Sequence, residues 1–205
     1  MSNEYKLVPA TDTRLNGLSR VVKTEEIKSE YIESVIKSMA RVAMGERDAE
    51  HPSLPTLVGL AAPQLGEMVR IILFDKIAGS SKPNFEPELT FIINPEITQS
   101  SSEEELGREG CYSTCNICAV VPRAKQITVC GLNESGGQVE YSLEDFQARI
   151  VQLEVDHLNG IRCPDRVRDP ARLHYVEKSD FQSYRENWQT WHQLCPPEDW
   201  LKIKK

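Results

Sequence analysis

The stretch that organises the chain is residues 142–160, which read SLEDFQARIVQLEVDHLNG. Ser142 is a good N-cap and Gly160 a good terminator, so the stretch predicts one helix. Glu144 and Asp145 would lie in its first turn, where carboxylates favour the positive end of the helix dipole. One stripe of this helix, at steps of four, three and four residues, consists of Phe146, Ile150, Leu153 and His157. Leu153 and His157 are therefore expected to be neighbours on one face.

Upstream, an amphipathic helix is predicted from Thr24, which is followed by two glutamates, to about Gly45. Its apolar face repeats every four residues at Ile27, Tyr31, Val35, Met39 and Ala43. The stretch from Glu46 to Thr56 is polar and contains two prolines, so it is predicted to be a long loop.

Between these two helices, short β-rich runs predict strands. The runs are Val69 to Phe74, Phe91 to Ile93, Ala119 to Val121, Gln126 to Gly131 and Gln138 to Tyr141, with Asn133 to Gly137 as the turn between the last two. Successive strands without alternating helices favour an α+β fold with antiparallel sheets. At 205 residues, the chain is predicted to form one domain over 1–205.

A C-terminal helix is predicted over about 179–195, ended by Pro196 and Pro197. One face of it consists of Phe181, Tyr184, Trp188, Trp191 and Cys195. We interpret this face as a docking surface on the core, with a homodimer contact as the alternative.

The composition is that of a soluble globular protein. A formal net charge of −7 argues against nucleic acid as a partner, because phosphate binding depends on clustered Lys and Arg. No apolar run approaches the roughly 18 residues of a membrane span, which argues against a membrane partner. The N-terminal residues show neither a secretory signal nor a transit peptide, so we expect a cytoplasmic protein, with an organelle as the alternative because a removed leader would leave no trace. The six cysteines are then expected to be thiols or ligands rather than disulfides.

Three segments carry chemically reactive residues. They are Gly59-Leu60-Ala61-Ala62-Pro63-Gln64-Leu65-Gly66, Glu109-Gly110-Cys111-Tyr112-Ser113 and Gln152-Leu153-Glu154-Val155-Asp156-His157-Leu158-Asn159-Gly160. Their sequences, order and separations resemble the three motifs of the peptide deformylase family. One short motif recurs by chance, whereas three in register are specific. The resemblance covers about residues 5–170 and implies antiparallel sheets around a central helix that bears the third motif.

The resemblance also implies a metal site. In the family, a cysteine of the second motif and two histidines at i and i+4 of the third hold a divalent ion such as iron, zinc, nickel or cobalt. Cys111 and His157 match two of these ligands. Leu153 stands at the position of the first histidine, and an isobutyl group cannot coordinate a metal.

Further roles follow from the same resemblance. Glu154 matches the general base and acid, and Gln64 matches a donor to the oxyanion, together with the backbone N–H of Tyr112. The positions that would contact a peptide-like substrate are Gly59, Leu60, Gly110 and Leu153.

The missing histidine leaves several interpretations open. Cys115 and Cys118 lie close to Cys111 in the sequence and could replace the ligand, although free cysteines are more often buried packing residues. Glu154 could become a ligand and cease to be the base. Without any metal, Cys111 and His157 could instead form a nucleophilic thiolate–imidazole pair.

Other polar residues are given structural interpretations. Asp156 is expected to be a structural carboxylate or to pair with Arg123. His51, His174 and His192 lie outside the motifs and are interpreted as surface or packing residues, although His51 could approach the pocket from the loop before the first motif.

Three functions remain open. The first is a metal-assisted amide hydrolase that removes formyl or another small acyl group from a peptide-like substrate with an altered ligand set. The second is a different catalyst that acts on a small molecule through Glu154, His157, Gln64 and Cys111. The third is an inactive homologue that binds a peptide or a small ligand. The retained base and oxyanion donor favour an enzyme.

Overall fold

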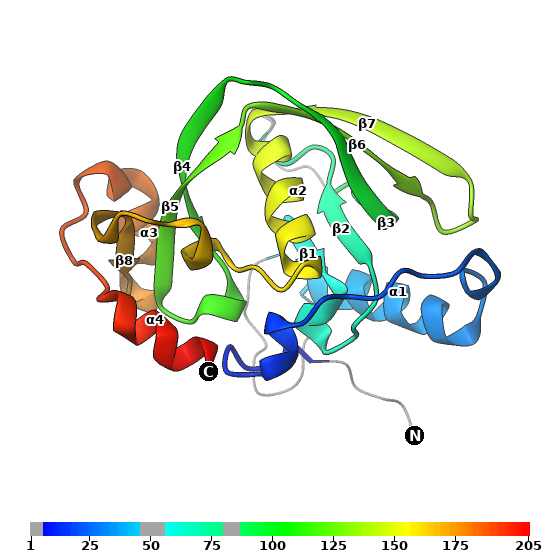
Figure 1. The fold of residues 1–205 in the computed structure, drawn as a ribbon, viewed down its shortest axis with the longest axis horizontal. Helices are drawn as coiled ribbons and strands as arrows, with labels where there is room; N and C mark the ends of the chain where they lie inside the picture. The colour runs from blue at the N-terminus through cyan, green and yellow to red at the C-terminus, as the bar shows by residue number, and fades with distance from the viewer. Residues whose placement is uncertain (1–5, 46–55, 80–86) are drawn as a thin grey trace.

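Two antiparallel sheets enclose a central helix in the computed structural model, which describes residues 6–45, 56–79 and 87–205 (Figure 1). The larger sheet has the order β1-β2-β3-β6-β7, formed by Gly59–Ala61, Ile71–Asp75, Leu89–Ser100, Gln126–Leu132 and Gln138–Glu144. The smaller has the order β4-β5-β8, formed by Glu104–Gly110, Ile117–Ala124 and Leu173–Tyr175. All of their strand pairs are antiparallel. The predicted α+β class is therefore confirmed.

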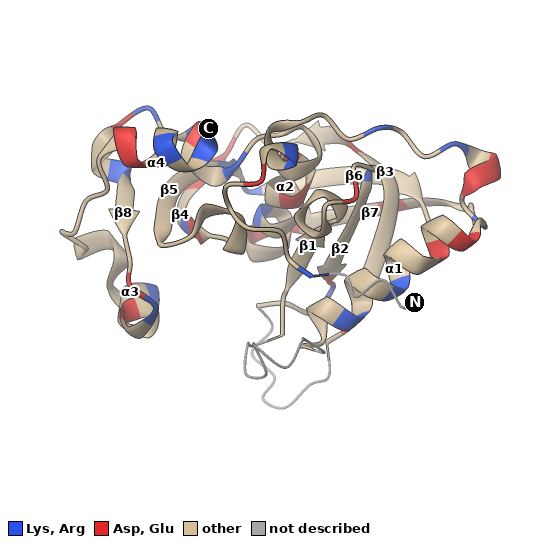
Figure 2. Cartoon of the chain, turned by 90° about the horizontal axis from the view of Figure 1, so that it is seen from below, with Lys and Arg blue, Asp and Glu red and all other residues tan. Residues whose placement is uncertain are grey.

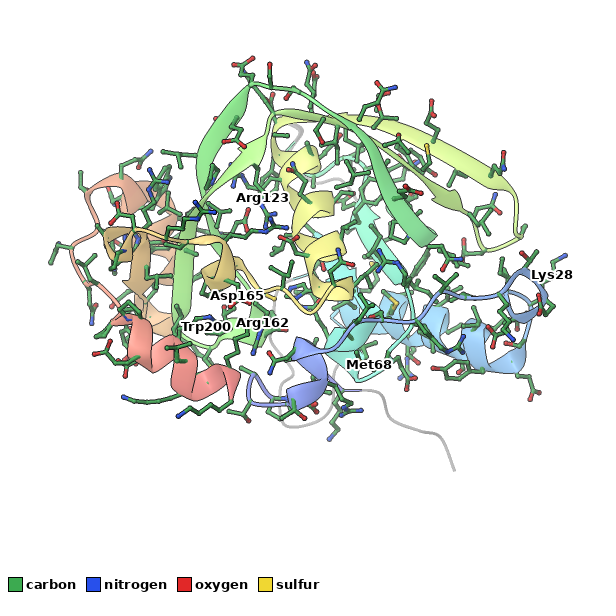
Figure 3. The ribbon with its side chains drawn as sticks, viewed as in Figure 1. Lys28, Met68, Arg123, Arg162, Asp165 and Trp200 are labelled. Carbon is green, nitrogen blue, oxygen red and sulfur yellow. The ribbon has the colours of Figure 1, made fainter. Side chains whose placement is uncertain are left out.

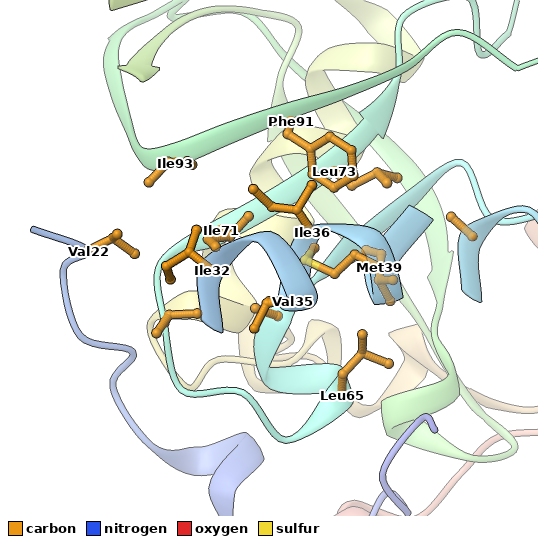
Figure 4. Packing of buried hydrophobic residues seen from close by; sticks show 14 of the residues in the cluster. Val22, Ile32, Val35, Ile36, Met39, Leu65, Ile71, Leu73, Phe91 and Ile93 are labelled. Carbon is orange, nitrogen blue, oxygen red and sulfur yellow. The ribbon is translucent and has the colours of Figure 1, made fainter. Parts of the chain in front are cut away.

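The central helix is α2 (Asp145–Leu158), which bears the third motif between the two sheets (Figure 1). Its residues Ala148, Val151 and Leu158 are buried against one face of the larger sheet, in a cluster that includes Ile72 and Ile92. Helix α1 (Glu30–Ala43) covers the other face, where Ile71 and Leu73 pack against Ile32, Val35 and Met39 (Figure 4). Alternate residues of β2 thus serve two cores, as a strand with both faces covered requires.

Two short helices lie beside the smaller sheet. Helix α3 (Phe181–Asn187) buries Tyr184 against Cys118, and α4 (Pro197–Lys204) buries Trp200 against residues of β5 and β8. Figure 2 shows Lys and Arg beside Asp and Glu on α1, α3 and α4, so these helices present both signs of charge. Among the described residues, no helix has the length and apolar character needed to cross a bilayer.

The N-terminal ends of both long helices differ from the prediction. Helix α1 begins at Glu30 because the Ser29 hydroxyl accepts the N–H of Ile32, and Thr24–Glu26 forms only a 3₁₀ turn. Ser142 is not a cap, because it belongs to β7, and α2 begins three residues later at Asp145. Two members of the predicted stripes, Tyr31 and Phe146, are consequently exposed. The predicted loop of residues 46–56 lies outside the described residues except for Thr56.

The C-terminal segment and several strands also differ. The helix predicted over 179–195 is confined to α3, followed by a 3₁₀ turn at Trp188–Thr190. Pro197 begins α4 rather than ending a helix, since proline at the first helical position loses no hydrogen bond. Strands β1, β4 and β8 were not predicted, and β3 extends well beyond Ile93. The turn of residues 133–137 is confirmed between β6 and β7.

Candidate active site

The first two motifs lie where β1 and β4 end, and the third lies on α2 itself. Strand β1 leads into the 3₁₀ turn Ala62–Leu65, which carries Gln64, and β4 leads into the turn Tyr112–Thr114 beside Cys111. Helix α2 supplies Glu154 and His157, both buried. The structure thus places residues from all three motifs in one site.

Gln64 links the first two motifs through a buried side chain. Its Oε1 accepts the N–H of Ala61 at 2.8 Å, which fixes the orientation of the amide. Its Nε2 then donates to Cys111 Sγ at 3.1 Å and to Ser113 Oγ at 3.4 Å. The amide N–H₂ therefore faces the cysteine, where a donor to a developing oxyanion would be needed.

Cys111 and His157 face each other, with 3.4 Å between Sγ and Nε2. Zinc–sulfur and zinc–nitrogen bonds at a tetrahedral angle would place the two donors roughly 3.6 Å apart, so the pair matches one edge of a metal site. His157 Nδ1 has no hydrogen-bond partner among the described residues, although a ligand histidine normally donates this N–H to an acceptor. The Cys111–His157 pair thus has the spacing of two metal ligands, but the histidine lacks the hydrogen-bond acceptor that normally supports a ligand.

The position of the absent histidine is apolar. Leu153 is half-buried and packs against a cluster formed by Ile117, Ala119, Val121, Cys163, Leu173, Cys195 and Trp200. Within the described ranges, no three Cys, His, Asp or Glu side chains gather to hold a metal ion. Cys111 and His157 occupy two of the three ligand positions that the resemblance implies, and the described residues do not complete a metal site.

Neither neighbouring cysteine completes the ligand set in this structure. Cys115 is exposed. Cys118 packs with Val176 and Tyr184, whereas Ala119, the next residue of β5, faces the cluster around Leu153. Because side chains alternate along a strand, Cys118 faces away from α2. The interpretation of Cys118 as a packing residue fits this arrangement.

The electrostatics of the site argue against a thiolate–imidazolium pair. Burial, with the nearby Glu154 carboxyl, raises the pKa of Cys111 to about 12. Burial also lowers the pKa of His157 to about 4. Both groups are therefore neutral near pH 7, and the cysteine lacks the ionised form that a nucleophile needs.

Glu154 is a buried carboxyl without a matching donor. It is 4% exposed, and its Oε2 has no hydrogen-bond partner among the described residues. Burial raises its pKa well above the usual value, and the carboxylates of Glu109 and Asp156 add to the shift. The neutral form of the side chain is thus favoured, and a protonated carboxyl can donate a proton to a leaving group.

Replacing Glu154 with glutamine is expected to stabilise the protein at neutral pH. Burial favours the neutral carboxyl of Glu154 in the folded protein, whereas in the unfolded chain the group ionises above its usual pKa of 4.5, so its contribution to stability falls as pH rises above that value. Glutamine does not ionise in either state, so the variant should gain about 1–2 kcal/mol in free energy of unfolding at pH 8, since one unit of pKa shift corresponds to about 1.4 kcal/mol. Urea denaturation at several pH values would show this gain shrinking toward pH 4.5. A variant less stable at every pH would contradict it.

Gly59 lies directly against the carboxyl of Glu154. A Cβ atom at this position would lie 2.6 Å from Glu154 Oε1 and 2.6 Å from Ile150 Cγ2. Gly59→Ala is therefore expected to displace Glu154 and lower the free energy of unfolding by about 1–3 kcal/mol, the usual cost of overpacking. Gly137→Ala, where the new Cβ meets the flexible Asn133 amide at 3.2 Å, is the control for urea denaturation. Equal effects of the two changes would contradict the steric explanation.

A buried network of charges lies next to Cys111 and His157 in the sequence. Arg123 donates to Glu109 from Nε and Nη2, at 2.9 Å each, and to Asp156 from Nη1 at 2.6 Å. Arg149 also binds Glu109, and Arg166 also binds Asp156. The expected pairing of Asp156 with Arg123 is confirmed.

Two residues beside the site were not identified from the sequence. Ser113 contacts Cys111 Sγ through its N–H and Gln64 through its hydroxyl, and its carbonyl accepts from Arg162. Arg162 is fully buried, which no local pattern indicates for an arginine. Among the other histidines, His174 is buried against Tyr184 OH and His192 is exposed, as interpreted. His51 lies outside the described residues.

Comparison with known proteins identifies the family. The family model for polypeptide deformylase matches residues 5–173. Peptide deformylase 1 of Prochlorococcus marinus (strain MIT 9313) is 37% identical over 168 residues, which cover 80% of each chain. The chloroplastic peptide deformylase 1A of Solanum lycopersicum is 33% identical over 184 residues, covering 85% of this chain and 63% of that protein.

A solved structure gives the same result. The Met-Ala-Ser-bound crystal structure of a class I type b peptide deformylase from Acinetobacter baumannii is 34% identical, with a TM-score of 0.68. The likeness covers 82% of this chain and all of the other. A central helix with a buried acid and two ligand-type residues, set between antiparallel sheets, defines a deformylase-like hydrolase. This chain belongs to the peptide deformylase family.

Proposed function

We propose that the protein is a hydrolase acting on the N-acyl end of a peptide-like substrate, with an incomplete set of metal ligands. The gathering of Gln64, Cys111, Glu154 and His157 in one site carries this proposal. A buried acid, an oriented amide donor and two ligand-type residues are the parts that amide hydrolysis requires. A formyl or other small acyl group fits the resemblance best.

The first strand supports a peptide-like substrate. Among the residues that the structure describes, strand β1 pairs only with β2, so it is an edge strand of the larger sheet. An extended peptide can add to such an edge through main-chain hydrogen bonds, beside Gly59 and Leu60. Two apolar side chains nearby in the sequence are partly exposed. Val58 immediately precedes this edge strand, and Tyr112 immediately follows Cys111. The related structure from Acinetobacter baumannii was solved with Met-Ala-Ser bound.

Each residue of the site has a role in this proposal. In its ionised form, which a bound cation would favour, Glu154 would take the proton of the attacking water and, once protonated, pass it to the leaving amine. Gln64 Nε2 and the backbone N–H of Tyr112 hold the carbonyl oxygen as it gains charge. Leu153 forms an apolar wall beside the acyl group.

The missing third ligand limits the expected activity. Cys111 and His157 are the residues that would hold a divalent ion. Loss of a residue that hydrogen-bonds to a ligand typically lowers metal affinity or activity ten- to hundredfold, and loss of a direct ligand should lower them more. The raised pKa of Glu154 also makes its ionised form, which a general base needs, less favourable in a site without an ion. We therefore expect deformylation far slower than with three ligands. The incomplete ligand set also favours a second candidate function, a binding protein for blocked peptide N-termini.

One experiment separates the two functions. Metal content is measured on protein purified without added metal or chelator, and a formyl-methionyl peptide is assayed for hydrolysis under anaerobic conditions and for binding by calorimetry. Turnover that Glu154→Gln abolishes while binding persists would support the hydrolase. Binding without turnover in either protein would support the binding function, and absence of both would contradict both proposals.

A further inference from the structure

Arg162 is a buried cation that contacts no carboxylate of the described residues with its guanidinium. Its side chain is fully buried, and its hydrogen bonds go to neutral acceptors: Ala10 O at 2.6 Å, Ser113 O at 3.0 Å and Asn16 Oδ1 at 2.7 Å. No ion pair of this guanidinium is found within the described ranges. Burying a charge without a partner of opposite sign is costly, so this arrangement suggests a role in holding its acceptors in place.

One of these acceptors belongs to the candidate site. Ser113 receives Arg162 at its carbonyl, while its N–H lies 3.4 Å from Cys111 Sγ and its hydroxyl lies 3.4 Å from Gln64 Nε2. A shift of Ser113 would therefore change both contacts of the thiol. The guanidinium thus binds Ser113 through its carbonyl, whereas the N–H and hydroxyl of Ser113 contact the site residues.

The C-terminal helix holds the guanidinium itself. The Trp200 ring of α4 covers Arg162, with 4.4 Å from Cζ to the ring centroid. Trp200 Nε1 donates to Asp165 Oδ1 at 2.9 Å, and Asp165 Oδ2 accepts the backbone N–H of Arg162 at 2.9 Å. Figure 3 shows Arg162, Asp165 and Trp200 side by side between α4 and the chain that follows α2.

We propose that Arg162 is a positioning residue for Cys111 and Gln64, and that Trp200 keeps it in position, so that α4 is a working part of the site. Helix α4 lies beyond residues 5–173, which the deformylase family model matches. Trp200 also belongs to the cluster on which Leu153 packs. The same helix thus supports both the cysteine turn and the apolar position that replaces a ligand. This inference goes beyond the proposed function, because it holds with or without turnover.

Two substitutions of one residue test the contact with α4. Trp200→Leu and Trp200→Phe are both apolar and both lose the hydrogen bond to Asp165, but only phenylalanine keeps a ring over Arg162. The second-order rate of iodoacetamide alkylation is measured for Cys111 and Cys130 by peptide mass spectrometry. Cys130, on β6, is the internal reference for loosening of the whole fold. Leu201→Ala, an exposed change on the same helix, is the control.

We expect Trp200→Leu to raise the Cys111-to-Cys130 rate ratio about tenfold, the scale of a desolvated cation–π contact. Trp200→Phe and Leu201→Ala should remain within about twofold of the parent protein on the same scale. Arg162→Lys retains the charge but loses the planar fork, so it should raise the ratio as well, and it provides the test if Trp200→Leu does not fold. Equal ratios in the leucine and phenylalanine variants, an unchanged ratio in Arg162→Lys, or a parallel rise at Cys130 would overturn the proposal.

Discussion

Replacing Leu153 with histidine is expected to raise the affinity for a divalent metal at least about a hundredfold, the effect of restoring a direct ligand rather than an outer one. Residue 153 lies one helical turn before His157, so a histidine there would join Nε2 of His157 and the thiol of Cys111. The site would then have the three protein ligands that tight metal binding requires, instead of two. Titration with zinc or cobalt, with equilibrium dialysis for zinc and absorption spectra for cobalt, measures the change.

Hydrolysis of a formyl-methionyl peptide by the loaded variant is the second readout. Leu153→Ala is the first control, since it removes the isobutyl group from its cluster without adding a ligand. Val155→His is the second, because it adds an imidazole to α2 at a position that packs instead with the core of the larger sheet. Stoichiometric metal without turnover in Leu153→His would show that the pocket has diverged by more than one ligand. Equal metal affinity in Val155→His would contradict the role of position 153.

The sequence by itself relates only those parts of the candidate site that lie on one helix. Glu154 and His157 lie on one helix, and a helical repeat determines which of their neighbours share a face. Gln64 and Cys111 could be placed only through the resemblance, since nothing local brings residues 47 positions apart together. The hydrogen bond from Gln64 to Cys111 agrees with that expectation.

The rest depended on contacts between distant segments. Strand β4 begins in an acidic run and buries Glu109, which becomes acceptable only through arginines supplied by β5 and α2. Strand β1 has three residues and no alternation to detect. Arginine is normally found at the protein surface, and the burial of Arg162 depends on Trp200 and the N-terminal segment. Pro197 is compatible with either end of a helix, so the sequence around it does not decide between them.

Replacing Arg123 with methionine is expected to lower the free energy of unfolding by about 3–5 kcal/mol, because it leaves two buried carboxylates without their shared partner. Glu109 and Asp156 are 2% and 4% exposed at the side chain, and Arg123 is 5% exposed. These residues hold β4 to α2. Glu109 lies two positions before Cys111, and Asp156 lies one position before His157. The Cys111–His157 contact should therefore loosen in the same variant.

Urea denaturation measures the loss, with Lys125→Met as the control. Lys125 pairs with Glu103 at 3.0 Å, but both side chains are largely exposed, so this change should cost at most about 1 kcal/mol. Adding Glu109→Gln and Asp156→Asn to Arg123→Met should recover part of the loss, since neutral amides are far less costly to bury than carboxylates. A loss in Arg123→Met no larger than in Lys125→Met would mean that the two carboxylates find other partners or take up protons, and that β4 and α2 are held together by their apolar contacts.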